Sequence, residues 1–200
     1  MELLIGLLGE ILANYMLGMS NMLNIFRKKA SGTRLSKDAN ASQPIYAIGD
    51  LHGRNDLLTK IMKLIRDDIR IVEGDSPPQR SKVIFLGDYV DRGLESRAVI
   101  ENLIQLDARE LDFVFLKGNH EQTLLQFIDD PAIGIQWSEH GAIETLASYG
   151  VEAPKIRSDL EAWRHAQSVF IRNIPDNHLE FIKKLELIHF DGPYAFVHAG

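Results

Sequence analysis

The apolar residues of this chain gather in short, uninterrupted runs that each end at a polar motif containing glycine. Two of the runs end in Gly-Asp, a third ends after one lysine in Gly-Asn, and a fourth ends in His-Ala-Gly. The four runs cover residues 45–48, 83–86, 113–116 and 194–197. Apolar runs of this length, bounded by glycine, are typical of strands that are buried on both faces.

Between these runs, apolar residues recur at the three- and four-residue spacing of a helix. The first stretch contains Leu57, Leu58, Ile61, Leu64 and Ile65, and the second contains Ala98, Val99, Leu103 and Leu106. Strand, loop and helix repeated at roughly thirty residues per unit predict an α/β fold with a parallel sheet. Because the crossovers are right-handed, the carboxyl ends of the strands should lie along one edge, where such sheets bind ligands.

Side chains that can bind metals follow each run at this edge. Asp50 and His52 are two residues apart, so an extended segment points both the same way. The other three runs are followed by Asp88, by Asn119 and His120, and by His198. Carboxylate, amide and imidazole donors suit manganese, iron or zinc. These donors are more numerous than one tetrahedral metal needs. Two metals about 3.5–4 Å apart that share a carboxylate would use them all.

Each motif taken alone also has an ordinary structural explanation. A Gly-Asp pair after a strand often marks only a turn, and Asn119 followed by Gln122 resembles a helix-capping pair. Turn chemistry does not account for such motifs in order at the ends of four runs. Their joint occurrence therefore predicts a metal site.

Composition narrows the class of protein further. A length of 200 residues indicates one domain, or one domain with a tail. Lys and Arg total 22 against 28 for Asp and Glu, and the net charge of -6 argues against a nucleic-acid partner, which would need a basic face. The chain has no cysteine, which excludes disulfides and thiolate ligands and fits a cytoplasmic location.

Residues 1–43 differ in character from the rest. Residues 3–19 are largely apolar, but Glu10 and Asn14 interrupt them, and a carboxylate at the centre of a bilayer is costly. The segment also lacks the basic start and small-residue cleavage site of a secretory signal. Membrane contact by this leader is therefore not the favoured interpretation.

Two interpretations of the leader stay open. It is either an amphipathic helix that lies on a membrane or a partner, or an upstream extension of a protein whose translation begins at Met19 or Met22, which we favour. Residues 30–43 are rich in Ser, Ala, Asn and Lys without an apolar period and indicate a linker. We expect the folded domain to cover residues 44–200.

The four motifs resemble, in order, those of the calcineurin-like metallophosphoesterases. Within that family they are most similar to the phosphoprotein phosphatase group, with its bacterial and phage serine/threonine phosphatases. The motifs are Gly49-Asp50-Leu51-His52-Gly53, Gly87-Asp88-Tyr89-Val90-Asp91-Arg92-Gly93, Gly118-Asn119-His120-Glu121 and His198-Ala199-Gly200. The resemblance implies a four-layer α/β/β/α sandwich with a dinuclear metal centre at one edge of two sheets.

The resemblance also implies a ligand set for two divalent metals, manganese first and iron or zinc as alternatives. Asp50 and His52 would bind the first metal, and Asp88 would bridge both. Asn119, through its amide oxygen, and His198 would bind the second metal. The oligomeric state does not follow from the sequence.

The implied activity is hydrolysis of phosphoserine, phosphothreonine or other phosphomonoesters by a hydroxide that bridges the metals. Arg92 would contribute a planar cation for the phosphoryl oxygens. His120 would protonate the alkoxide leaving group, with Asp91 as the partner that fixes its tautomer. The expected partner is a phosphoprotein or a small phosphoester.

The chain departs from the family pattern in two places. The family has a further metal-binding histidine downstream of the His-Ala-Gly motif, whereas this chain stops at Gly200. We therefore expect a catalytic domain that is incomplete at its C-terminus, with part of the second sheet missing, a weakly held second metal and low activity. An inactive binding module is one alternative.

The other departure is Ala199, where eukaryotic members generally have glycine. Alanine there resembles the bacterial phosphatases and also the symmetrical diadenosine tetraphosphate hydrolases, which are the second alternative. Asp91 favours phosphomonoester hydrolysis, since a polyphosphate leaving group has less need of a general acid.

The segment between Glu121 and His189 has no catalytic motif and should determine substrate preference. Helix-like pieces cover residues 122–128, 141–148 and 160–171, and Asp129-Asp130-Pro131 predicts a helix end. Three aromatic residues of this segment, Trp137, Tyr149 and Trp163, either line an entrance or fill the core, and we favour the core. The histidines outside the motifs are expected to be solvated or satisfied side chains rather than ligands. They are His140, His165, His178 and His189.

Overall fold

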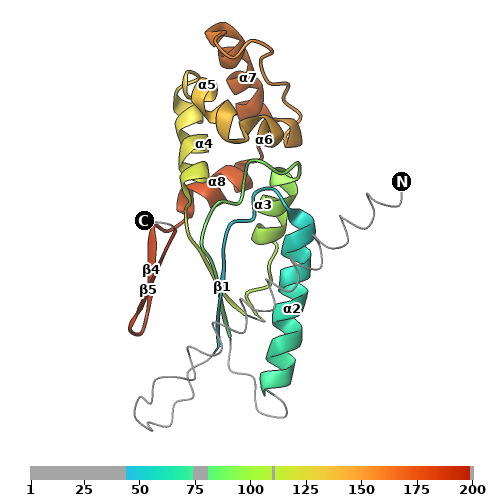
Figure 1. Ribbon diagram of the computed structural model, residues 1–200, viewed down its shortest axis with the longest axis vertical. Helices are drawn as coiled ribbons and strands as arrows, with labels where there is room; N and C mark the ends of the chain where they lie inside the picture. Colours follow the sequence, from blue (N-terminus) through green and yellow to red (C-terminus); the bar gives the residue numbers. More distant parts are fainter. Residues whose placement is uncertain (1–43, 74–80, 110, 199–200) are drawn as a thin grey trace, which may run out of the picture. The chain divides into compact units, whose positions relative to one another are not determined.

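A three-stranded parallel sheet organises the residues that the computed structural model describes, which are 44–73, 81–109 and 111–198 (Figure 1). Its strands, in the order β1-β2-β3, are β1 (Ile45–Ile48), β2 (Lys82–Phe85) and β3 (Asp112–Phe115). They match the first three predicted runs to within one residue. The predicted leader and linker, residues 1–43, lie outside the described residues.

The two predicted crossover helices are present, and a helical region follows the third strand. α2 (Asn55–Glu73) joins β1 to β2, and α3 (Ser96–Ile104) joins β2 to β3. After β3 come α4 (Asn119–Asp129), α5 (Ile133–Trp137), the 3₁₀ turn η1 (Ser138–His140), α6 (Ala142–Ser148), α7 (Leu160–Asn173) and α8 (Asp176–Lys184). Figure 1 shows α4 to α7 gathered beyond one end of the sheet. None of the helices described here has the length and apolar character needed to cross a bilayer.

The core follows from the helical spacing of α2 and from the aromatic residues of the helical region. Leu58, Met62 and Ile65 of α2 are buried and belong to the same apolar cluster as the sheet residues Val83 and Phe85. Trp137, Tyr149 and Trp163 are each about 1% exposed, which confirms them as core. Helix α4 ends at Asp129, where the Asp-Asp-Pro sequence predicts an end.

The fourth apolar run does not continue the parallel sheet. It forms β5 (Tyr194–Val197), which pairs antiparallel with β4 (Ile188–Asp191) in a separate two-stranded sheet. Only Gly192 and Pro193 connect these strands, and two residues are too few for the crossover that a parallel pair requires. The structure is thus mixed α/β with a small second sheet, in agreement with the predicted fold class.

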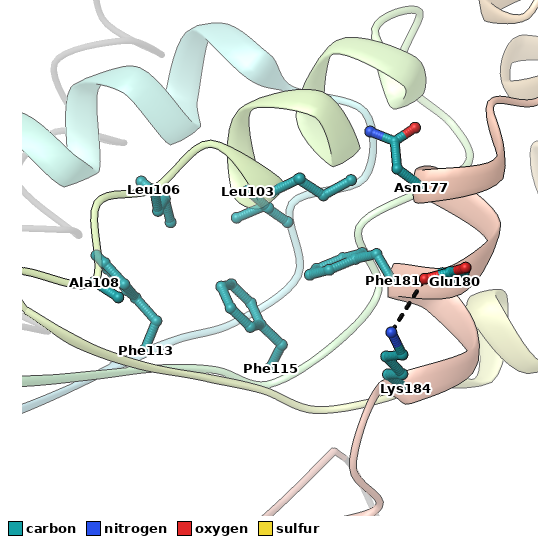
Figure 2. A pocket seen from close by; sticks show the side chains of 10 residues that line it. Leu103, Leu106, Ala108, Phe113, Phe115, Asn177, Glu180, Phe181 and Lys184 are labelled. Atoms are coloured by element: carbon teal, nitrogen blue, oxygen red, sulfur yellow. Dashed lines mark hydrogen bonds and ion pairs between the residues drawn. The ribbon is translucent and has the colours of Figure 1, made fainter.

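The edge strand β3 leaves an apolar hollow on the surface. The side chains of Phe113 and Phe115 on this strand are half-buried and line a pocket of about 380 Å³ between α3 and α8 (Figure 2). Phe181 of α8 contributes to its wall, and Lys184 pairs with Glu180 at its rim, with 3.1 Å between Nζ and Oε2. These lining residues all lie outside the four motifs.

His178 is a structural histidine that ties three helices together. Its ring is fully buried; Nδ1 lies 3.0 Å from the Tyr149 hydroxyl, which follows α6, and Nε2 lies 2.8 Å from Oε2 of Glu101 on α3. The hydrogen bond from His178 lowers the pKa of the Glu101 carboxyl. The interpretation of this histidine as a satisfied core residue is confirmed.

Replacing His178 by alanine should therefore lower the free energy of unfolding by about 2–4 kcal/mol, because it leaves a cavity and an unpaired buried hydroxyl on Tyr149. Urea unfolding followed by circular dichroism measures this change. The matched control is His165→Ala on the exposed face of α7, which should stay within about 0.5 kcal/mol of the wild type. Equal losses in the two variants would contradict the structural role.

Candidate metal centre

The loops after β1 and β2 hold four residues in a backbone conformation that is unfavourable for L-amino acids. His52, Asp88, Asp91 and Arg92 have φ angles of 42°, 56°, 73° and 65°, and they are the non-glycine residues with positive φ in the described ranges. Such conformations cost of order 1–3 kcal/mol each and concentrate at functional sites. All four were singled out from the sequence as site residues.

Backbone contacts clamp these loops against each other. The amides of Leu51 and His52 both donate to the Asp88 carbonyl at 2.9 Å, and the Gly53 amide donates to Tyr89 at 2.8 Å. Gly118, which follows β3, lies against Asp88 so closely that a Cβ atom at this position would collide with the Asp88 carboxylate. Only glycine therefore allows the third loop to approach Asp88.

Glu121 is an organising residue to which the sequence analysis gave no role. Its fully buried carboxylate accepts hydrogen bonds from the amides of Asp88 (2.9 Å), Tyr89 (2.8 Å), Val90 (3.2 Å) and Gly118 (3.0 Å). Burial, together with the charge of Asp88, raises the pKa of Glu121, although the amides of Gly118, Tyr89 and Val90 oppose the rise. A glutamate three residues after a helix N-cap is the available sequence signal for such a role.

Hydrogen bonds fix the tautomers of two of the histidines. Nδ1 of His52 lies 2.9 Å from the Val90 carbonyl, and Nδ1 of His198 lies 2.9 Å from the Leu86 carbonyl. A ring nitrogen facing a carbonyl must donate, so Nε2 of each neutral ring carries a lone pair. In His52 this Nε2 is buried and has no hydrogen-bond partner. An orphaned imidazole lone pair of this kind is what a metal ligand presents.

The oxygen atoms around these lone pairs are acceptors as well. Asp50 Oδ2 lies 3.5 Å from Nε2 of His52, and Asp88 Oδ2 lies 3.8 Å from the same atom. Nε2 of His198 lies 3.1 Å from Asn119 Oδ1 and 3.3 Å from Asp88 Oδ2. Acceptors that face acceptors repel one another unless a cation lies between them, so the donor set fits divalent metals.

Two groups of ligand atoms emerge, and Asp88 belongs to both. One contains His52, Asp88 and His120, and the other contains Asp50, Asp88 and His198, with ligand atoms within 4.8 Å of one another in each group. The shared carboxylate agrees with the bridging role that the family resemblance implies. The division of the other residues differs from the implied one, because His120 joins the first group and Asp50 the second.

The sequence-predicted ligands Asp50, His52, Asp88, Asn119 and His198 are thus brought together from three loops and the end of β5. His140, His165, His178 and His189 lie outside both groups. The residues predicted to form a metal site at the sheet edge thus lie close together, and their roles as ligands stay a prediction.

A separate network of hydrogen bonds surrounds Asp91. His120 Nδ1 lies 2.6 Å from Asp91 Oδ2, which also accepts from the Trp137 indole at 2.7 Å, while Thr145 donates to Oδ1 at 2.6 Å. Burial lowers the pKa of His120, but the hydrogen bond and charge of Asp91, with the charge of Asp88, raise it by more, so the net shift is upward. The buried carboxylate thus favours the protonated ring.

Trp137 and Thr145 are site residues that the sequence analysis missed as such. They come from α5 and α6, where no motif precedes them, and only the tertiary fold brings them to Asp91. Arg92 is exposed beside this network, and its charge acts against protonation of His120. Its guanidinium has no ion-pair partner within the described part of the chain, so a cation is available for an anionic ligand.

Residues 43–200 match the family described as calcineurin-like phosphoesterase, which is most of the chain. The chain belongs to this family. Calcineurin-like phosphoesterases use divalent metals, in accordance with the donor set described above.

Relatives of this calcineurin-like phosphoesterase include serine/threonine-protein phosphatases. The PP2A-like phosphatase PPG1 of Candida albicans is 43% identical over 79 residues, which cover 39% of this chain and 17% of that protein. PPG1 of Saccharomyces cerevisiae is 33% identical over 97 residues, which cover 48% of this chain and 24% of that protein. The matched part is thus no more than about a quarter of either relative.

Solved structures give a similar picture of partial coverage. A crystal structure described as a "putative diadenosine tetraphosphatase" is 18% identical, with a TM-score of 0.46, and the match covers 80% of this chain and 52% of that chain. A metallophosphoesterase from Sphaerobacter thermophilus is 16% identical, with a TM-score of 0.35, over 77% of this chain and 46% of that chain.

Proposed function

We propose that the protein is a metal-dependent phosphatase that hydrolyses phosphoserine and phosphothreonine in proteins. The observation that carries this proposal is the convergence of imidazole lone pairs and carboxylate oxygens on Asp88, directly beside the buried Asp91–His120 pair. The converging lone pairs and carboxylate oxygens suit a pair of cations, and the Asp91–His120 pair suits proton transfer. Hydrolysis of a phosphoserine or phosphothreonine ester draws on both, because its alkoxide leaving group is strongly basic.

The proposed ligands are Asp50 and His52 for one metal, Asn119 and His198 for the other, and Asp88 for both. Oxygen and imidazole donors favour manganese, with iron or zinc as alternatives. When bound, such a pair of cations lowers the pKa of a coordinated water and neutralises charge on the phosphoryl group. The reaction would take place in the cytoplasm on a phosphoprotein partner.

The chain's own residues would bind the substrate and move the proton. Arg92 supplies an exposed, permanently charged fork for the phosphoryl oxygens. His120, protonated at both ring nitrogens, holds Asp91 through Nδ1 and presents the proton on Nε2, 3.9 Å from Asp88 Oδ2, to the site. An alkoxide leaving group is strongly basic and needs that proton. The Asp91–His120 pair therefore favours a phosphoserine substrate over a polyphosphate.

The test compares three substrates with added Mn²⁺, namely a phosphoserine peptide, p-nitrophenyl phosphate and diadenosine tetraphosphate. We expect turnover of the first two and a clear preference for them over the third. Preference for diadenosine tetraphosphate would reassign the substrate class. Inactivity on all three would favour a binding module without catalysis.

Trp137 is a positioning residue in this proposal, because it acts on His120 only through Asp91. Replacing it by phenylalanine removes the indole donor to a buried carboxylate, and hydrogen bonds to charged groups contribute about 1.5–3 kcal/mol. We expect kcat for the phosphoserine peptide to fall about tenfold. The same variant should change kcat for p-nitrophenyl phosphate less than threefold, since nitrophenolate leaves without protonation.

Trp163→Phe is the matched control. Trp163 is equally buried in the same aromatic cluster, but its indole donates to the Arg157 carbonyl at 2.8 Å, not to a site residue. Both variants lose similar packing, so a difference between the two substrates is expected only for Trp137→Phe. An equal fall in kcat on both substrates would show that Trp137 contributes only packing.

A further inference from the structure

A pocket of about 290 Å³ lies between α4 and the α5–η1 segment, next to the proposed metal centre. Asn119 is one of its lining residues, and the amide oxygen of this residue is the atom that lies 3.1 Å from His198 Nε2. Trp137, whose indole holds Asp91, forms part of its wall. A ligand in this pocket would therefore lie beside both the proposed metal ligands and the Asp91–His120 network.

The lining of this pocket, which we call the amide pocket, is polar but contains no carboxylate, ammonium or guanidinium group. Besides Asn119 and Trp137, its polar lining consists of Thr123, Gln126, Gln136 and His140. The side chains of Gln126 and Gln136 are exposed and make no hydrogen bond with the described residues. Two amide groups are thus free to bind a ligand.

This chemistry selects among phosphoester substrates. A side-chain amide offers two donors and an acceptor with two lone pairs, which complement the N–H and C=O groups of a peptide main chain. A polyphosphate chain, in contrast, carries several negative charges, which Lys or Arg side chains bind strongly. The amide pocket has neither, whereas it is well matched to an uncharged, hydrogen-bonding ligand.

We infer that the amide pocket binds the peptide main chain that flanks the phosphorylated residue, with Gln126 and Gln136 as its principal contacts. The inference rests on the proposed phosphatase function and assigns its substrate class to a specific surface. Gln126 and Gln136 become specificity residues that act on the binding of a peptide substrate, and the chemical step is independent of them.

The test uses the whole chain carrying Gln126→Ala and Gln136→Ala together. KM for a phosphoserine peptide should rise about 4- to 100-fold, because each neutral hydrogen bond typically contributes a factor of about 2 to 10. Turnover at saturation should stay within about twofold of the wild type. With p-nitrophenyl phosphate, which has no peptide, both kinetic constants should stay unchanged.

The matched control is Gln122→Ala, on the same helix but outside the pocket, which should leave the peptide KM unchanged. A second readout does not depend on turnover. In a His120→Asn background with Mn²⁺, fluorescence anisotropy of a labelled phosphoserine peptide should show Kd raised by the same factor as KM.

Three results would overturn the inference, and they are distinguishable. Equal KM changes for the peptide and for p-nitrophenyl phosphate, or none for either, would remove the amide pocket from peptide binding and leave the phosphatase function intact. Weakened use of diadenosine tetraphosphate alone would make the pocket a nucleoside site. A wild type inactive on every phosphoester would remove the proposed function, and the inference with it.

Discussion

Replacing His120 by asparagine should lower kcat for a phosphoserine peptide by roughly 10²–10⁴-fold, the usual contribution of a positioned general acid. The loss is expected because the His120 ring, whose protonated form Asp91 favours, is the proposed proton donor for an alkoxide. With p-nitrophenyl phosphate the loss should be below about tenfold. Steady-state kinetics on both substrates, together with elemental analysis of the purified variant, measure the effect.

The metal content decides between two roles for this residue. His120 lies within the geometric group formed with His52 and Asp88, so it has the position of a ligand as well as that of an acid. If the metal content is unchanged and kcat falls only for the peptide, His120 has the role of a general acid. If about one metal equivalent is lost and kcat falls equally for both substrates, His120 is a metal ligand. His165→Asn, an exposed substitution of the same kind, should change neither quantity.

Asp88→Asn should weaken the binding of both metals and reduce turnover by at least about 10³-fold. The prediction follows from the single Oδ2 atom of Asp88, which lies 3.8 Å from His52, 3.9 Å from His120 and 3.3 Å from His198, measured to Nε2 in each case. Removing its charge takes away the one carboxylate that both groups share, and metal stabilisation of the reaction amounts to several kcal/mol. Isothermal titration with Mn²⁺ measures the first effect and kinetics the second.

Thermal unfolding supplies a control that separates metal loss from misfolding. Wild-type protein should gain melting temperature on addition of Mn²⁺, since a ligand that binds only the folded state stabilises it. The metal-free Asp88→Asn variant should be at least as stable as the metal-free wild type, because the repulsion between Asp88 and the buried Glu121 is removed. Asp129→Asn, an exposed carboxylate at the end of α4, should retain the full metal response. A retained response in Asp88→Asn would refute the shared-ligand role.

The parallel sheet and its edge were predictable because local pattern and topology agree. Short apolar runs ending in glycine indicated the strands, although β2 alone among the described strands is buried along most of its length. Parallel strands place their carboxyl ends at the same edge of the sheet. The hairpin of β4 and β5 was not predicted in this way. Periodicity reports that residues 194–197 form a strand, but strand pairing depends on the two-residue turn at Gly192 and Pro193.

The candidate site divides along similar lines. Asp50, His52, Asp88, Asn119 and His198 could be proposed as ligands in advance because each closely follows an apolar run and because the motifs resemble those of the family. The supporting residues, such as Glu121 beneath the loops, lie in helices and have only a weak capping pattern as a signal. Their roles depend on which backbone groups face them.

By itself the sequence determined which candidate side chains follow each strand, because the distance of a residue from the end of its strand is a local property. The helical crossovers between the strands further predicted the shared edge at which they meet. The tertiary structure alone decided how those side chains are grouped around Asp88 and what holds Asp91. Trp137 and Thr145 are 46 and 54 positions away along the chain, each in a separate helix. Contacts at that separation arise from the packing of whole helices and strands. They follow no fixed spacing along the chain, so a sequence pattern does not predict them.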